Sequence, residues 1–461
     1  MASNVQEEGP GKKLTGPGEV CYFGNLLQLD EKAHVTYEKW AKEYGSVVGF
    51  SMGPMGEAML INGAKEFEAA FKPGSDNDAN FNNRWRPYIL KKIGYEGSIT
   101  WENWLPHAKE RKHLFFEVLK SIDMEGVFKR EVNAVCDVIE KDKTVDIVDL
   151  INTANNNILL SITINRSNRF EYADDEFKKL SEIIVSNNTH SLFGHPVNFS
   201  RLLWYTPAAS AIRRTDKDVK EALQPYIKSH RENFDKDNIR DLIDGYLGHL
   251  GETSFDVDDA INGTTHLYPS ICSLRSAIEW TILLLVTHED VQKKVHDEID
   301  EVLVDGDVSD DIITSKMPYV NRVIKESLRL ASPVGQILPH CPHSDVNFEG
   351  YRVKKDTTVF ASIYGPHHDS EIWPEPLLFK PDRWIGKEEY PHGFIPFGSG
   401  MRKCAGYKVA PIALRMFTVT IFKKFHLKGV EGEKIPTLDD VYMEAGTTHP
   451  KNFNVVATLR K

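Results

Sequence analysis

The segment 395–410, IPFGSGMRKCAGYKVA, combines a cysteine with closely spaced glycines. Phe397, Gly400, Cys404 and Gly406 follow the spacing FxxGxxxCxG. Glycines let the backbone turn tightly, and a glycine-rich loop before a helix directs backbone N–H groups toward the cysteine sulfur. Such donors stabilise a thiolate and tune a metal-bound one. The spacing therefore favours a metal-ligating thiolate. The alternative is a buried structural cysteine at a helix start.

This segment resembles the haem loop of the cytochrome P450 superfamily, in which the cysteine is the axial thiolate ligand of haem iron. The family has a Glu-x-x-Arg helix before the loop, and Glu326 and Arg329 match it here. Between the two, the family has an aromatic and proline-rich segment, which here ends in Pro381-x-Arg383-Trp384. The resemblance implies haem b bound through Cys404. It also implies a buried ion network of Glu326, Arg329 and Arg383 around the haem loop, for which arginine–carboxylate geometry is suited.

The resemblance also implies cationic partners for the haem propionates. Arg402 matches the propionate arginine of the family, and His340 in LPH matches a second contact. A third cation is expected from the basic helix within 104–113, where Arg111, Lys112 or His113 are the candidates. The alternative for this basic run is a solvated helix face. The haem loop itself is expected to contact the haem through Phe397, Gly398 and Gly406.

The sequence departs from the family at the oxygen-activating helix. In the family an acid and a threonine there deliver protons to dioxygen, as a monooxygenase requires. Alignment on residues downstream places Cys272 at the acid and Ser273 at the threonine. A cysteine does not supply protons as a carboxylate does. Pro269 removes a helical N–H and is expected to kink or break the helix over the haem. The alternative is an alignment slip of about a turn.

The altered relay favours a group of the superfamily that needs no proton delivery. Hydroperoxide lyases, allene oxide synthases and epoxyalcohol synthases cleave the O–O bond of a lipid hydroperoxide homolytically and rearrange it, without NADPH or a reductase. We therefore expect a lipid hydroperoxide as substrate and an epoxyalcohol as product. Asn262 is a candidate contact of the hydroperoxide, with a helix N-cap as the alternative. The alternative function is an NAD(P)H-dependent monooxygenase that uses Ser273 as a weakened relay and needs a redox partner. A third hypothesis is a non-catalytic haem-binding protein or sensor.

Composition sets outer limits on these hypotheses. The chain has 461 residues and a formal net charge of −11, which argues against a nucleic-acid partner. Its five cysteines form no CxxC pair, which favours a reducing compartment. No run reaches the roughly 18 apolar residues of a membrane span, and the polar N-terminus lacks the apolar core of a signal peptide. These features predict a soluble or cytoplasmic protein that is not secreted and has no transmembrane anchor.

Periodicity indicates the elements that position the cysteine. The prediction is a mainly α protein with small antiparallel β-sheets, in one cytochrome P450 haem domain over residues 21–461 that follows a flexible polar lead-in over residues 1–20. Helical patterns cover 34–45, 108–122, 218–234, 278–303 and 317–330, and strand patterns cover 46–53, 57–63, 346–353 and 357–365.

Overall fold

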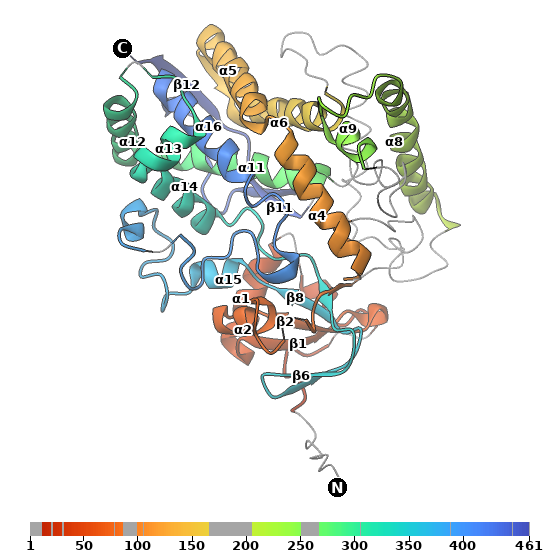
Figure 1. The fold of residues 1–461 in the computed structure, drawn as a ribbon. Helices are drawn as coiled ribbons and strands as arrows, with labels where there is room; N and C mark the ends of the chain where they lie inside the picture. The colour runs from red at the N-terminus through yellow and green to blue at the C-terminus, as the bar shows by residue number, and fades with distance from the viewer. Residues whose placement is uncertain are drawn as a thin grey trace.

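A larger helical part and a smaller part rich in strands make up the molecule (Figure 1). The computed structural model describes residues 12–19, 22–29, 32–77, 79–85, 99–104, 106–165, 205–249, 267–304, 306–387, 389–444 and 446–460. The α-helices described are α1 (Ala33–Tyr44), α2 (Ala64–Phe71), α4 (Pro106–Ser121), α5 (Met124–Asp142), α6 (Ile147–Ile164), α8 (Pro207–Glu232), α9 (Leu242–Leu247), α11 (Leu267–Thr287), α12 (Glu289–Val302), α13 (Asp310–Lys316), α14 (Pro318–Ala331), α15 (Tyr364–His368) and α16 (Ala410–Lys424).

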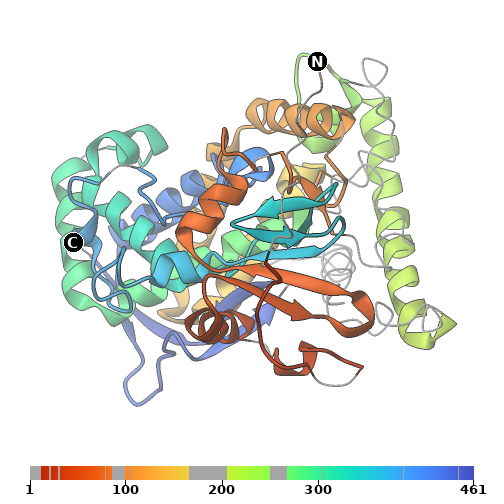
Figure 2. The same cartoon turned by 90° about the horizontal axis from the view of Figure 1, so that it is seen from below.

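The strands form four small sheets. The largest has the order β1-β2-β8-β5-β3, with a parallel pair between β2 and β8 and antiparallel neighbours elsewhere, and Figure 2 shows it from below. The strands are β1 (Val47–Ser51), β2 (Glu57–Ile61), β3 (Asn83–Arg84), β4 (Thr144–Asp146), β5 (His340–Cys341), β6 (Val346–Phe348), β7 (Tyr351–Val353), β8 (Thr358–Ala361), β9 (Phe425–Gly429), β10 (Val441–Glu444), β11 (Thr447–Pro450) and β12 (Asn454–Leu459). The predicted fold class, mainly helical with small sheets, is confirmed.

Four predicted segments have different bounds in the structure. The helix predicted over 218–234 is part of α8, which begins at Pro207, and the strand pattern over 346–353 is the hairpin of β6 and β7. The helical pattern over 278–303 belongs to two helices, because α11 ends at Thr287 and α12 begins at Glu289 at an angle of 106° to it. The strand pattern over 357–365 ends at Ala361, and α15 begins at Tyr364. Elsewhere the boundary signals hold: Gly45 ends α1 with a positive φ of 103°, which suits glycine at a helix C-terminus.

The core of the helical part surrounds α11, which packs on α6, α14 and α16. Trp280 of α11 is 1% exposed, and its indole Nε1 donates to the carbonyl of Thr448 in β11 at 2.8 Å. Among the described residues, no single helix is long and apolar enough to span a membrane. Only α11 and α12 taken together reach that length and hydropathy, and they are bent at their junction.

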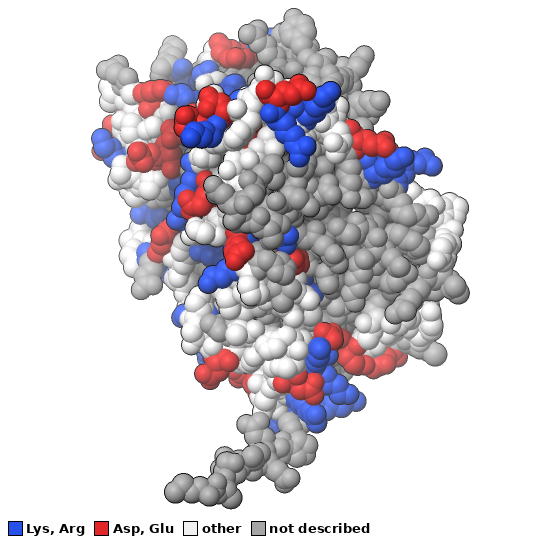
Figure 3. Space-filling view, turned by 45° about the vertical axis from the view of Figure 1, so that its right-hand side comes forward, with Lys and Arg blue, Asp and Glu red and all other residues white. Residues whose placement is uncertain are grey.

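Acidic and basic side chains are interspersed on the surface. On the face shown in Figure 3, the described Lys and Arg side chains lie beside Asp and Glu side chains rather than in a patch of one sign. The excess of acidic residues is therefore not gathered on this face.

Candidate functional site: a thiolate loop and its cavity

The loop around Cys404 is held by its own backbone. The Cys404 N–H donates to the carbonyl of Phe397 at 2.9 Å, which closes the loop. Gly398 and Gly400 have φ values of 66° and 70°, the left-handed region that glycine adopts without strain. At Gly400 a Cβ would lie 2.1 Å from the carbonyl oxygen of Phe71 in α2. A side chain at this position would push the loop off α2, so Gly400 is required by both conformation and space.

The Cys404 thiol faces a cavity and has hydrogen-bond donors and cations around it. Burial raises the pKa of this thiol, while the backbone N–H of Gly406 and the ammonium groups of Lys112 and Lys403 act to lower it. A sulfur in this setting is a poor free thiolate but a well-prepared metal ligand, because a bound cation would supply the missing charge compensation.

The cavity in front of the thiol has a volume of about 1140 Å³. Its lining is mostly apolar and comes from α1, α4, α5, α6, α11, the segment 332–340 and the haem-loop residues 396–406. The predicted contacts in the wall are Phe397, Gly398, Gly406, Arg402, His340, Lys112 and Ser273. The structure thus places most of the predicted site residues in the wall of one cavity.

Three cationic side chains of this wall, Arg84, Lys112 and Arg402, lie close enough for their charges to interact. Arg402 donates to the carbonyls of Asn82, Ile99 and Glu102, and its guanidinium lies 4.7 Å from the ring centre of Trp104. Burial lowers the pKa of Arg402 to about 10.

Lys112 of α4 donates to the carbonyls of Met401 and Lys403 in the loop, at 2.7 and 2.9 Å. Burial, with the charges of Arg402 and Arg84, lowers its pKa to about 8. Arg84 lies in β3 and donates to the carbonyls of Thr100 and Leu338; no motif in the sequence indicates it.

Within the described residues, the hydrogen bonds of Arg84, Lys112 and Arg402 end on backbone carbonyls or on His340, and on no carboxylate. Burial lowers the pKa of all three, and the charge of Arg402 lowers those of Arg84 and Lys112 further. Buried cations of this kind are stabilised when an anion binds between them. The two propionate carboxylates of haem fit this requirement, and the thiol of Cys404 in the same cavity fits the iron.

His340 and Arg111 differ from the expected cations. His340 is buried; its Nδ1 donates to the carbonyl of Phe81, and its Nε2 accepts from Arg84 Nη1. Burial and the Arg84 charge hold the pKa of His340 well below its usual value, so its ring is neutral. Arg111 does not line the cavity, and its Nη1 forms an ion pair with Glu102 at 2.9 Å. Lys112 is the member of this basic run that reaches the loop.

Glu326 is the centre of a buried ion network behind the loop. Its carboxylate accepts from Arg329 Nε and Nη2 at 3.0 and 2.9 Å, from Arg383 Nε at 2.8 Å and from Trp384 Nε1 at 2.9 Å. Arg329 also donates to the carbonyl of His367 at 2.7 Å. The His367 ring then accepts from the N–H of Ile395 at 3.0 Å. The three residues expected to interact do so, and His367 connects them to the thiolate loop.

The distal wall is built by α11 and by the hairpin of β10 and β11. Ser273 lines the cavity, whereas Cys272 is 1% exposed and its thiol lies 3.9 Å from Glu444 Oε1. Pro269 lies within α11, and because the residues before Leu267 lie outside the described ranges, the kink expected at Pro269 stays a prediction. Asn262, the predicted contact of the hydroperoxide, also lies outside the described ranges.

The comparisons with known proteins match most of the chain. A family model for cytochrome P450 matches residues 14–456. The chain belongs to the cytochrome P450 family. It is 25% identical to cytochrome P450 1A1 of Platichthys flesus over 97% of this chain and 91% of that protein, and 28% identical to cytochrome P450 2C29 of Mus musculus over 92% and 90%. A zebra fish cytochrome P450 structure with progesterone has a TM-score of 0.81 at 18% identity and covers 93% of this chain and 100% of that one. The cofactor of the family is haem b with a cysteine thiolate as axial ligand, as the sequence predicted.

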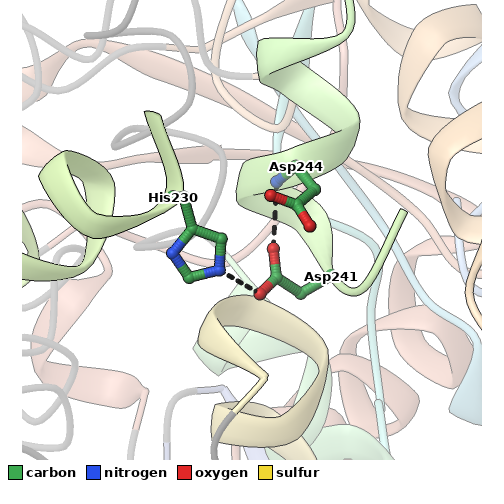
Figure 4. A group of neighbouring side chains, drawn as sticks. All are labelled: His230, Asp241 and Asp244. Atoms are coloured by element: carbon green, nitrogen blue, oxygen red, sulfur yellow. Dashed lines mark hydrogen bonds and ion pairs between the residues drawn. The ribbon is translucent and has the colours of Figure 1, made fainter. Parts of the chain in front are cut away.

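A second polar cluster lies away from this cavity. His230 of α8 and Asp241 and Asp244 of the α9 region lie within metal-ligand reach of one another (Figure 4). His230 Nε2 is bonded to Asp241 at 2.6 Å, and Arg240 Nη2 donates to Asp244 at 2.8 Å. The carboxylates are already engaged by cations, so this cluster ties α8 to α9 by ion pairs.

Proposed function

We propose that this protein is an NAD(P)H-dependent haem-thiolate monooxygenase that hydroxylates or epoxidises a hydrophobic substrate. The observation that carries the proposal is the large apolar cavity joined to the Cys404 thiol. The similarity to cytochrome P450 relatives over nine-tenths of the chain supports it. When bound, haem supplies the activation of dioxygen and the transfer of one oxygen atom to the substrate. A redox partner that delivers electrons belongs to this proposal, as does a single haem domain over residues 21–461 after a lead-in over residues 1–20.

The residues of the chain have separate tasks in this proposal. Cys404 ligates the iron, and Arg84, Lys112 and Arg402 hold the propionates. The Glu326 network keeps the loop in place, so that the haem is bound in one orientation. Gln336 lines the cavity, and its buried Oε1 has no hydrogen-bond partner among the described residues. An unsatisfied acceptor in an apolar wall favours a substrate with a hydroxyl or amine that donates to it.

A second candidate function is the conversion of lipid hydroperoxides by O–O homolysis, with epoxyalcohol formation. It is favoured by the sequence alignment, which places Cys272 at the family's acid position on α11. It needs neither NADPH nor a redox partner.

Two parallel incubations of the haem-loaded protein separate the functions. In the first, a microsomal reductase, NADPH and a panel of hydrophobic compounds are supplied, and oxygenated products are counted against NADPH consumed. In the second, a polyunsaturated fatty-acid hydroperoxide is supplied alone, and the conjugated-diene absorbance is followed. Products in the first incubation and none in the second support the monooxygenase, whereas the reverse result overturns it.

A further inference from the structure

The β10–β11 hairpin brings an acid close to Cys272, the residue that the sequence alignment places at the family's acid position. Glu444 ends β10, and its Oε1 lies 3.9 Å from the Sγ of Cys272, 172 residues earlier in the chain. Glu444 lines the same cavity as Ser273 and Cys404. Among the described residues of that cavity wall it is the single carboxylate. The wall of the cavity therefore contains a carboxylate near Cys272, contributed by the hairpin and not by α11.

The carboxylate of Glu444 is held in a fixed direction. Arg275 Nη1 donates to Glu444 Oε2 at 3.0 Å, while Arg275 Nε donates to Glu279 at 2.6 Å and its Nη2 to the hydroxyl of Tyr442 at 2.6 Å. The side chain of Arg275 is 6% exposed and that of Glu444 is 18% exposed. Glu444 Oε2 thus accepts from the guanidinium, and Oε1 accepts from the thiol of Cys272.

A buried histidine connects Glu279 to the hairpin that carries Glu444. His449 Nδ1 lies 2.8 Å from Glu279 Oε2, and its Nε2 lies 2.7 Å from Thr447 Oγ1. The Thr447 hydroxyl donates to the backbone carbonyl of Glu444 at 2.7 Å. Residues of α11 and of both strands of the hairpin therefore fix the position of Glu444.

We propose that Glu444 is the proton donor of the distal cavity and takes the part that Cys272 does not fill on α11; this inference rests on the proposed monooxygenase function. Each turnover consumes one dioxygen, two electrons from NAD(P)H through the redox partner and two protons. One oxygen atom enters the substrate, and the other leaves as water. Glu444 releases its proton from Oε1 into the cavity, where the proton ends in that water, and the carboxylate regains a proton from solvent.

The main test is Glu444→Gln, which keeps the size of the side chain and an acceptor for Arg275 but removes the acid. We expect product formation to fall about 100-fold, the low end for loss of a general acid, with peroxide released in place of product for each NADPH consumed. Haem content and the thiolate spectrum should stay as in the wild type. Glu431→Gln, an exposed carboxylate in the same C-terminal region, is the matched control and should leave product per NADPH unchanged. Glu444→Asp, which keeps the acid on a shorter side chain, should retain more product than Glu444→Gln.

Two further measurements separate a proton-donor role from a structural one. Adding Cys272→Asp to Glu444→Gln puts a carboxylate back on α11 beside the lost one, and product per NADPH should recover at least tenfold. Infrared difference spectra of the resting protein on acidification should show protonation of a buried carboxyl group that is absent in Glu444→Gln. The inference is overturned if Glu444→Gln forms as much product per NADPH as the wild type, or if product per NADPH does not recover in the double variant. Absence of any NADPH-dependent product from the wild type instead overturns the proposed function.

Discussion

The thiolate loop and the distal wall face each other across one cavity but are built in different ways. The loop places its sulfur, glycines and cation within about ten residues, and its backbone closes on itself at Phe397 and Cys404. The distal wall joins α11 to a hairpin about 170 residues away, through Cys272, Arg275 and Glu444. The contrast teaches that a contiguous element is visible as a motif in the sequence, whereas a cluster of residues that are distant in the chain leaves no such pattern.

The largest effect is expected at the thiolate. Cys404→Ser keeps the loop geometry but removes the sulfur, so the haem loses its anionic soft ligand. We expect oxygenation to become undetectable and the carbon monoxide difference spectrum of the reduced protein to lose its thiolate form. Cys136→Ser, at a buried cysteine in α5 away from the cavity wall, should retain that spectrum. Retention of the thiolate spectrum in Cys404→Ser would remove Cys404 as the ligand.

The scaffold behind the loop should respond next most strongly. Glu326→Gln removes the charge that two arginines share, at a fully buried position. Leaving buried guanidinium groups without their carboxylate costs about 3–5 kcal/mol of unfolding free energy, measurable by denaturant titration of the haem-loaded protein. Lys293→Ala, which breaks an exposed ion pair with Asp297 on α12, should cost under about 0.5 kcal/mol. Comparable losses in the two variants would contradict the central place of Glu326.

The distal scaffold should tolerate a comparable change better. Tyr442→Phe removes one hydroxyl that accepts from Arg275, while Glu279 and Glu444 still hold the guanidinium. We expect a loss of about 1–2 kcal/mol and a severalfold drop in product per NADPH, because Arg275 then holds Glu444 less tightly. A loss of unfolding free energy as large as that of Glu326→Gln would contradict the expectation that the distal wall tolerates such a change better than the support of the loop.

Two buried histidines provide the smallest and most specific comparison. Next to the loop, His367 Nδ1 faces the hydroxyl oxygen of Ser332, and its Nε2 accepts from Ile395, so its ring is neutral. Burial, with the nearby charges of His368 and Arg329, holds the pKa of His367 well below its usual value. In the distal wall, His449 Nδ1 lies 2.8 Å from Glu279 Oε2 and its Nε2 lies 2.7 Å from Thr447 Oγ1.

The pH dependence follows from the sign of the His367 shift. Because its folded pKa is lowered, its contribution to stability is present above the unfolded value of 6.5 and is lost as the pH falls below it, by up to about 1.4 kcal/mol per pH unit. His367→Gln should therefore flatten the thermal stability profile in acid, and ¹⁵N spectra of labelled histidine at neutral pH should lose the signal of one neutral ring in this variant. A wild-type profile as flat as that of His367→Gln would contradict the neutral assignment.

The sequence was sufficient for the fold class and for most of the loop side of the cavity. Motifs such as FxxGxxxCxG and Glu-x-x-Arg are local, because backbone turns and one helix face determine their geometry. Glu326, Arg329 and Arg383 lie in the network expected of them.

Three features could not be read from the sequence. Arg84 reaches the cavity from a strand of two residues, and its position depends on pairing with β5. The ion pair of Arg111 with Glu102 depends on how a loop packs on α4. Glu444 depends on where a hairpin meets α11. In each case the tertiary contact, rather than spacing along the chain, determines the role.

The network around Glu326 also has a consequence for the order of folding. Its donors include Arg383 and Trp384, 57 and 58 residues further along the chain. While the chain is being synthesised, Arg329 of the same helix is the first partner available to Glu326. The buried charge of Glu326 is not fully compensated until Arg383 and Trp384 have left the ribosome. We therefore expect the final compaction of the helical core to follow the synthesis of residue 384, with the thiolate loop, immediately after it in the chain, closing onto an already completed support.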